Sequence, residues 1–173
     1  MGWETHGLEF SAEAVDYAVN HLKLDVSVGS ITQVEFPENS FDIITIIGTI
    51  EHLSDPIAAI RKIKKILKPG GYLAITTINT KGLVRLFDLK PPEHIFLFSK
   101  KNLSILLERE NFKILKSSPY WCHYHLNEAI DRAIRLIFKP GRRIEKFLGS
   151  IPFLKIQMKV PTNEMFVLSQ KLK

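Results

Sequence analysis

The stretch FDIITIIGTIEHLSDP at residues 41–56, followed by LKPGGYLAITTI at residues 67–78, decides how this chain folds. Residues 41–47 form a short apolar run rich in isoleucine, which favours a strand buried on both faces of a parallel sheet. Residues 56–67 carry apolar side chains at helical spacing with basic side chains between them, so they are predicted to form an amphipathic helix. The stretch therefore predicts a strand–helix–strand crossover, the unit of an α/β sheet.

Local signals define the two ends of that helix. Asp55 is a good N-cap, and Pro56 suits the first helical position because its missing N–H has no partner there in any case. Pro69, Gly70 and Gly71 are expected to end the helix and turn the chain into the second apolar strand.

Further strands and helices are expected on both sides of the crossover. Ser11 and Ser99 are each predicted to cap a helix with a periodic apolar face. The expected strands lie at residues 5–10, 26–28, 41–47, 72–78, 112–117 and 165–170. Strands that alternate with helices indicate an α/β fold with a mostly parallel, doubly wound sheet.

Residues 119–161 interrupt this alternation and are expected to form a helical insertion. They hold eight Lys/Arg and three Asp/Glu, a net charge of +5 out of +6 for the whole chain. We expect a mobile, solvated lid over the active site. Alternatively, the insertion contacts a membrane surface or a lipid-like or anionic substrate, because apolar and basic residues alternate at helical spacing. Nucleic-acid binding is not expected, since aromatic residues suited to base stacking are not interleaved with the basic ones.

The composition indicates one soluble globular domain over residues 1–173, with 45% hydrophobic and 24% charged residues. The single cysteine, Cys122, excludes an internal disulfide and favours a reducing cytoplasm. The run Trp121-Cys122-His123-Tyr124-His125 lacks the separated second pair of ligands that zinc sites use, so we expect the start of a helix there and no metal.

The crossover resembles the fourth strand, fourth helix and fifth strand of class I S-adenosylmethionine-dependent methyltransferases. EHLSDP at residues 51–56 and LKPGG at residues 67–71 are similar to elements of the small-molecule group of that superfamily. The resemblance covers residues 1–118 and 162–173. It implies a Rossmann-like methyltransferase fold whose last strand runs antiparallel between the fifth and sixth strands. It also implies S-adenosylmethionine as cofactor and a small molecule as methyl acceptor, through oxygen, nitrogen or carbon.

The resemblance places the nucleoside part of the cofactor at the carboxyl ends of the second and third family strands. Glu9 would accept hydrogen bonds from the two ribose hydroxyls, although it could also be a solvated loop carboxylate. Phe10 would pack near the adenosine, or else belong to the core. Near the adenine, Ser30 would form a weak hydrogen bond, and the backbone of Ile31 would provide a further contact.

The fourth family strand would bring further residues to the same edge. Gly48 and Thr49 lie at its carboxyl end, where a residue without a side chain lets the cofactor approach. His52, beside Glu51, could take a proton from a substrate hydroxyl, since imidazole titrates near neutral pH. Alternatively, Glu51 or His52 bonds backbone groups at this turn, because many methyl transfers need only aligned donor and nucleophile. His94 would bond the substrate or brace its loop.

One feature of the family has no counterpart in these 173 residues: no Gly-x-Gly-x-Gly pattern occurs. The family's first strand and its glycine-rich loop would precede Met1. That loop lets the backbone approach the methionine part of the cofactor, and the strand would lie between the second and fourth strands. We therefore expect exposed strand edges that favour self-association. A fragment, a shortened reading frame and a degenerate relative remain as explanations, the last being a non-catalytic module that has lost cofactor binding.

We predict that the 173-residue chain binds S-adenosylmethionine weakly or not at all, because nothing in it replaces the loop that grips the methionine carboxylate and amine. Calorimetric titration of this chain, beside a version extended upstream by the first strand and loop, tests the prediction. Micromolar binding with turnover by the shorter chain would contradict it.

Overall fold

The computed structural model describes residues 2–81, 93–125 and 157–173. Within these ranges the chain forms six strands, three α-helices and one 3-10 turn. Their order is β1 (Gly7–Glu9), α1 (Ala12–Asn20), β2 (Val26–Val28), β3 (Phe41–Ile47), η1 (Ile50–His52), α2 (Pro56–Ile66), β4 (Leu67–Ile78), α3 (Lys100–Arg109), β5 (Phe112–His125) and β6 (Gln157–Lys171). The alternation of strands and helices up to β5 agrees with the α/β class expected from the sequence.

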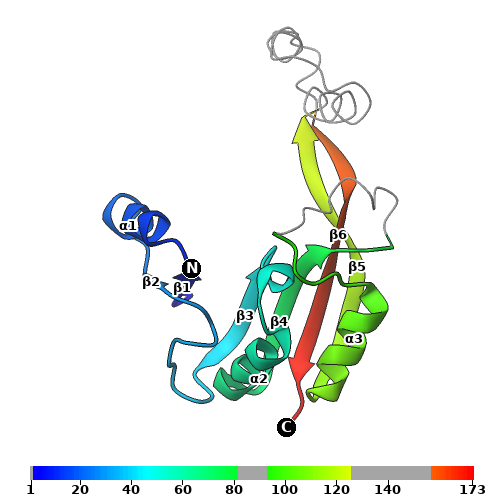
Figure 1. Cartoon of the computed structure of the whole chain (residues 1–173), viewed down its shortest axis with the longest axis horizontal. Helices are drawn as coiled ribbons and strands as arrows, with labels where there is room; N and C mark the ends of the chain where they lie inside the picture. The colour runs from blue at the N-terminus through cyan, green and yellow to red at the C-terminus, as the bar shows by residue number, and fades with distance from the viewer. Residues whose placement is uncertain (1, 82–92, 126–156) are drawn as a thin grey trace, which may run out of the picture.

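The larger sheet has four strands in the order β3-β4-β6-β5 (Figure 1). β3 and β4 are parallel, whereas β6 is antiparallel to both of its neighbours. The last strand therefore lies between the two strands that precede it, as the resemblance implied.

β1 and β2 form a separate parallel pair that Figure 1 shows beyond the β3 edge of the larger sheet. Among the described residues, β1 pairs only with β2 and β3 pairs only with β4, so each keeps one unpaired edge. Aromatic contacts link the two parts: the Phe36 ring lies 5.4 Å from His6 and 5.2 Å from Phe41, between ring centroids. The expected exposed edges are therefore present in the described part of the chain.

Helices α2 and α3 bury one face of the larger sheet. Ile60 and Ile63 of α2 and Leu103 and Leu107 of α3 are completely or almost completely buried against the sheet. Their sheet partners in this core are Ile46, Leu73, Ile75, Phe112, Met165 and Val167. A single apolar core on one face therefore holds the helices and the four strands together.

The opposite face of β3 is open, which corrects the expectation that this strand is buried on both faces. Ile43 is 41% exposed and Ile47 is 66% exposed. Neither α2 nor α3 can cover these side chains, because both helices pack on the other face. Continuous hydrophobicity in a strand predicts burial only where a second layer is present.

Helix α2 begins as predicted, since the Asp55 carboxylate accepts a hydrogen bond from the Ala58 amide at 2.9 Å and Pro56 is the first residue. It ends at Ile66 and strand β4 starts at Leu67, so the prediction that Pro69, Gly70 and Gly71 end the helix is wrong: these residues lie within β4. Gly71 has no room for a side chain, because a Cβ there would lie 2.9 Å from the Lys68 carbonyl oxygen. Gly71 lies where the register between β3 and β4 shifts, and the close approach of the backbone there needs glycine.

Strands β5 and β6 are longer than the sequence predicted and form an antiparallel ribbon. Its pairs extend from Phe112 with Lys171 to His125 with Gln157. The expected helix start at residues 121–125 is therefore wrong, because alternating aromatic and polar residues suit a strand as well as a helix end. Residues 119–125 and 157–161 of the expected insertion belong to this ribbon, and its predicted helices lie in residues 126–156, outside the described residues.

We predict that Asp55→Ala lowers the free energy of unfolding by about 1 kcal/mol, because the helix loses its N-terminal cap. Urea unfolding followed by circular dichroism measures the change. The neighbouring substitution Ser54→Ala is the control and should leave the midpoint almost unchanged; equal losses in both variants would contradict a capping role.

Candidate functional site

A tight turn follows β3 at the carboxyl end of the larger sheet. Gly48 adopts φ +55°, a conformation that favours glycine, and its amide donates to the Thr76 carbonyl oxygen at 3.0 Å. A Cβ at Gly48 would meet no atom within 4 Å, so the space in front of the turn is open. The Thr49 hydroxyl donates back to the Ile47 carbonyl at 2.9 Å and stabilises the turn. The turn thus offers a backbone surface that a ligand can approach.

Glu51 is buried directly after this turn. Its carboxylate accepts a hydrogen bond of 2.8 Å from the Thr77 hydroxyl on β4, and only 4% of the residue is exposed. Its carbonyl oxygen accepts from the amides of Ile95 and Phe96 at 2.9 and 3.1 Å. Glu51 therefore connects the β3 turn to β4 and to the loop before α3. Sequence reasoning missed Thr77, because a threonine in a strand gives no sign of its partner.

His52 lies on the exposed side of the same turn. Its Nδ1 atom is 2.7 Å from the Glu93 carbonyl oxygen. Because a carbonyl oxygen only accepts, Nδ1 must carry the proton, which leaves Nε2 of the neutral ring as an acceptor. The His94 ring lies 4.9 Å away between centroids, at 56°. The structure therefore brings together two of the histidines singled out in the sequence.

Glu9 and Phe10 follow β1, at the edge of the smaller sheet. One oxygen of the Glu9 carboxylate accepts a hydrogen bond of 2.8 Å from the Ser11 amide, while the side chain stays exposed. The Glu9 carbonyl oxygen accepts from the Gly29 amide at 2.9 Å, which ties the ends of β1 and β2 together. Phe10 is 80% exposed, so core packing does not explain it.

Ser30 and Ile31 occupy the turn after β2. The Ser30 carbonyl oxygen accepts hydrogen bonds from the amides of Gln33 and Val34 at 2.9 and 3.0 Å. The Ile31 side chain packs against the main core, so it links the β2 turn to the larger sheet and leaves its backbone for contact with a ligand. Gly29 is needed before them, since a Cβ there would lie 2.6 Å from Val34 and its φ is +150°.

The predicted site residues thus form two groups at the carboxyl ends of parallel strands. Glu9, Phe10, Ser30 and Ile31 follow β1 and β2, and Gly48, Thr49, Glu51 and His52 follow β3, with His94 beside the latter group. No three His, Cys, Asp or Glu side chains within the described ranges are grouped so that they could hold a metal ion. None of the helices in those ranges has the length and apolar character that crossing a bilayer requires.

Comparison with known proteins identifies the family. A family profile described as a methyltransferase domain matches residues 1–117, two thirds of the chain. The chain belongs to this methyltransferase family. The resemblance recognised in residues 51–56 and 67–71 is therefore confirmed.

Its curated relatives match over part of their length. An uncharacterised methyltransferase of Schizosaccharomyces pombe is 35% identical over 82 residues, which are 40% of this chain and 30% of that protein. A ubiquinone biosynthesis O-methyltransferase of Coxiella burnetii is 30% identical over 95 residues, 52% of this chain and 41% of that protein. Phosphoethanolamine N-methyltransferase 3 of Arabidopsis thaliana is 39% identical over 75 residues, 40% of this chain and 15% of that protein. The chain thus spans less than half the length of these relatives.

Solved structures show the fold. A methyltransferase of Haloferax volcanii in complex with the Trm112 activator superposes with a TM-score of 0.67 at 16% identity, over 97% of this chain and 72% of that one. The [4+2]-cyclase SpnF superposes with a TM-score of 0.58 at 20% identity, over 96% of this chain and 65% of that one. These likenesses confirm the Rossmann-like methyltransferase fold, and the cyclase illustrates that one fold serves different reactions.

We predict that Thr77→Val destabilises the protein by about 1–3 kcal/mol, because the buried Glu51 carboxylate loses its hydroxyl donor. Chemical denaturation measures the loss. Thr45→Val, on the exposed side of β3, is the matched control and should cost little. If the two substitutions had the same effect, the Glu51–Thr77 hydrogen bond would not be the cause.

Proposed function

We propose that this domain transfers a methyl group from S-adenosylmethionine to a small-molecule acceptor. Family membership supports the reaction class. The observation that carries the proposal is the turn after β3, where open space in front of Gly48 lies near a histidine, His52, whose Nδ1 is engaged by a carbonyl oxygen. Ligands of open α/β sheets bind at the carboxyl ends of strands, where this turn lies.

The residues present fit the nucleoside half of the cofactor. Glu9 has one carboxylate oxygen without a hydrogen bond in the described part of the chain, suited to ribose hydroxyls, and the exposed Phe10 ring is suited to contact with the adenosine. The Ser30–Ile31 turn would border the adenine, and the Gly48–Thr49 backbone would pass beneath the ligand. When bound, S-adenosylmethionine supplies a methyl group on a positively charged sulfur. We assign no residue to its methionine carboxylate and amine.

We assign proton handling to His52. Nε2 of the neutral ring can accept a proton from an acceptor hydroxyl while Nδ1 stays bonded to the Glu93 carbonyl oxygen. Glu51 positions this turn through Thr77, and does not contact the acceptor in our proposal. His94, beside His52, would help orient the acceptor. Where the acceptor is an amine or a carbon, His52 would serve only to brace the loop at Glu93.

The relatives support a small-molecule acceptor, but they do not determine which of its atoms receives the methyl group. One is named an O-methyltransferase of ubiquinone biosynthesis and another a phosphoethanolamine N-methyltransferase. The cytoplasm remains the location we propose, on the single cysteine alone. Residues 126–156 carry most of the charge of the proposed lid and lie outside the described residues, so a role over the active site or against a lipid-like acceptor also remains a proposal.

A non-catalytic module is the competing function. One observation favours it: among the described residues, the β1–β2 pair is separated from the larger sheet. A module of this kind would keep the fold without positioning a methyl donor. Binding of S-adenosylmethionine and of S-adenosylhomocysteine therefore distinguishes the two proposals directly.

We predict that Glu9→Ala weakens S-adenosylmethionine binding by about tenfold or more, because charge-assisted hydrogen bonds to the ribose are lost. The protein for this test is the chain extended upstream by the family's first strand and loop, and calorimetry gives the affinity. Glu13→Ala, which removes an equal charge from the first turn of α1, is the control. Unchanged affinity in Glu9→Ala would remove this residue from the site.

We predict that His52→Gln slows methylation of a phenolic acceptor, because the ring nitrogen that accepts the hydroxyl proton is lost, and leaves methylation of an amine nearly unchanged. Radiolabelled methyl transfer to a panel of simple phenols and primary amines, with the extended chain, provides the assay. The KM for S-adenosylmethionine should stay unchanged. Equal rates of the variant and the unsubstituted protein toward phenols, or equal slowing toward phenols and amines, would show that His52 acts only as a brace.

A further inference from the structure

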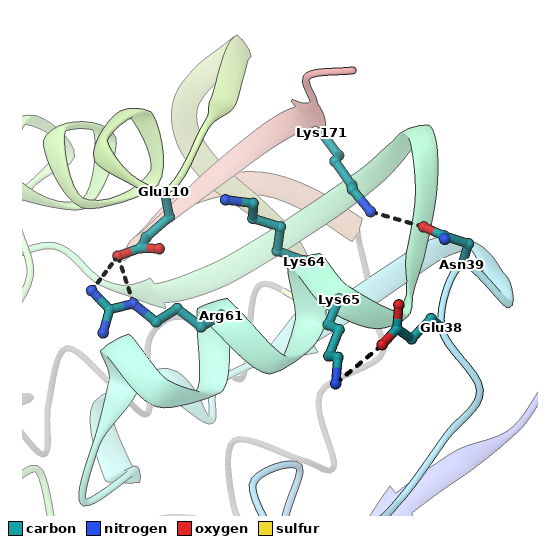
Figure 2. A pocket seen from close by; sticks show the side chains of 7 residues that line it. All are labelled: Glu38, Asn39, Arg61, Lys64, Lys65, Glu110 and Lys171. Atoms are coloured by element: carbon teal, nitrogen blue, oxygen red, sulfur yellow. Dashed lines mark hydrogen bonds and ion pairs between the residues drawn. The ribbon is translucent and has the colours of Figure 1, made fainter.

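A pocket lies at the opposite end of the larger sheet from the proposed methyl-transfer site. Its volume is about 550 Å³, and its lining residues are Glu38, Asn39, Arg61, Lys64, Lys65, Glu110 and Lys171 (Figure 2). They come from the turn before β3, the second half of α2, the end of α3 and the end of β6. Four separate segments therefore converge on one hollow at the amino ends of β3 and β4.

The two acids of this pocket are each engaged by one of its cations. Arg61 donates to the Glu110 carboxylate, with 3.0 Å from Nη2 to Oε1. Lys65 pairs with Glu38 at 3.1 Å. Four basic and two acidic residues line the pocket, so these pairs leave a net charge of +2 on the other two cations.

Those two cations, Lys64 and Lys171, have no carboxylate partner among the described residues. Lys171 Nζ donates to two neutral acceptors, the Asn39 side-chain oxygen at 3.0 Å and the Leu67 carbonyl oxygen at 2.6 Å. Burial lowers the pKa of the Lys171 ammonium, repulsion from Lys64 lowers it further, and attraction to Glu38 opposes both. Figure 2 shows the Lys64 side chain lying in the pocket between the Arg61–Glu110 pair and Lys171.

The position of these lysines needs a reason beyond the helix end. Lysines near the C-terminus of a helix interact favourably with its dipole, which accounts for Lys64 and Lys65 on α2. The helix end also accounts for one bond of Lys171, whose ammonium donates to the carbonyl oxygen of Leu67, the C-cap residue of α2. It does not account for the approach of Lys64 to this partly buried ammonium, since the two cations repel each other. A bound anion would offset both the burial of Lys171 and its repulsion by Lys64.

We propose that this pocket binds the dianionic phosphate group of a small molecule. A phosphate matches the net charge of the two lysines and offers several acceptor oxygens, which an ammonium donor and the Asn39 amide group can reach. The volume of about 550 Å³ exceeds what one phosphate fills, so the organic part of a phosphomonoester is accommodated as well. The site is separate from the carboxyl-end turn and does not depend on the proposed methyl transfer.

The test is calorimetric and thermal titration of the 173-residue chain with inorganic phosphate and with glycerol 2-phosphate, against sodium chloride at matched ionic strength. We expect both phosphates to raise the melting temperature beyond the chloride control. Lys64→Gln should weaken phosphate binding by about tenfold or more, because one charge-assisted hydrogen bond is lost. Lys101→Gln, an equal change of charge on the exposed first turn of α3, should have less than about a twofold effect, because a distant exposed charge is screened.

Lys171→Gln should weaken binding in the same way, and circular dichroism checks that it folds; if it does not fold, Lys64→Gln decides. The proposal fails if phosphate acts no differently from chloride, or if Lys64→Gln and Lys101→Gln have equal effects. Vesicles of phosphatidic acid in phosphatidylcholine distinguish the source of the phosphate. Binding to these vesicles without binding of the soluble phosphates would overturn the small-molecule assignment.

Discussion

The parallel ladder between β3 and β4 is the constraint on which both proposed sites depend. It aligns Ile43 with Tyr72 and Ile47 with Thr76, and so fixes where each strand begins and ends. The Gly48 turn follows the carboxyl end of the ladder, and just beyond it the Glu51 carboxylate accepts a hydrogen bond from the Thr77 hydroxyl. At its amino end it sets the turn into β3 beside the last residues of α2. One set of backbone hydrogen bonds therefore positions both the turn of the proposed methyl-transfer site and the pocket of the proposed phosphate site.

The sequence predicted those parts of the fold whose signals are local. The cap at Asp55, the helix after Ser99 and the apolar run of β3 all depend on neighbours within a few residues, and the structure has each of them. Burial of β3 was predicted incorrectly on one face, because the covering layer is not encoded in the strand itself. The length of the β5–β6 ribbon was underestimated, since its pairing from His125 to Gln157 crosses the intervening residues 126–156 and so depends on a distant partner.

In the candidate site too, residues with local sequence signals were predicted and residues with distant partners were missed. His52 and His94 were identified from their place beside short, recognisable sequence elements, and the structure sets their rings 4.9 Å apart. Thr77 and the Glu93 carbonyl were missed, because their hydrogen-bond partners are distant in the sequence. Thr77 is 26 residues from Glu51, and Glu93 is 41 residues from His52. The pocket around Lys171 was missed for the same reason: its lining comes from the turn before β3, the second half of α2, the end of α3 and the end of β6.

The ribbon of β5 and β6 has a consequence for how this domain can vary. His125 and Gln157 are paired across the ribbon, so the chain leaves and returns at one point. Closing the intervening segment into a loop costs conformational entropy, which the β5–β6 ladder below it offsets. This entropic cost grows only slowly with the length of the segment. The segment can therefore be exchanged, shortened or extended between related proteins without a change in the sheet.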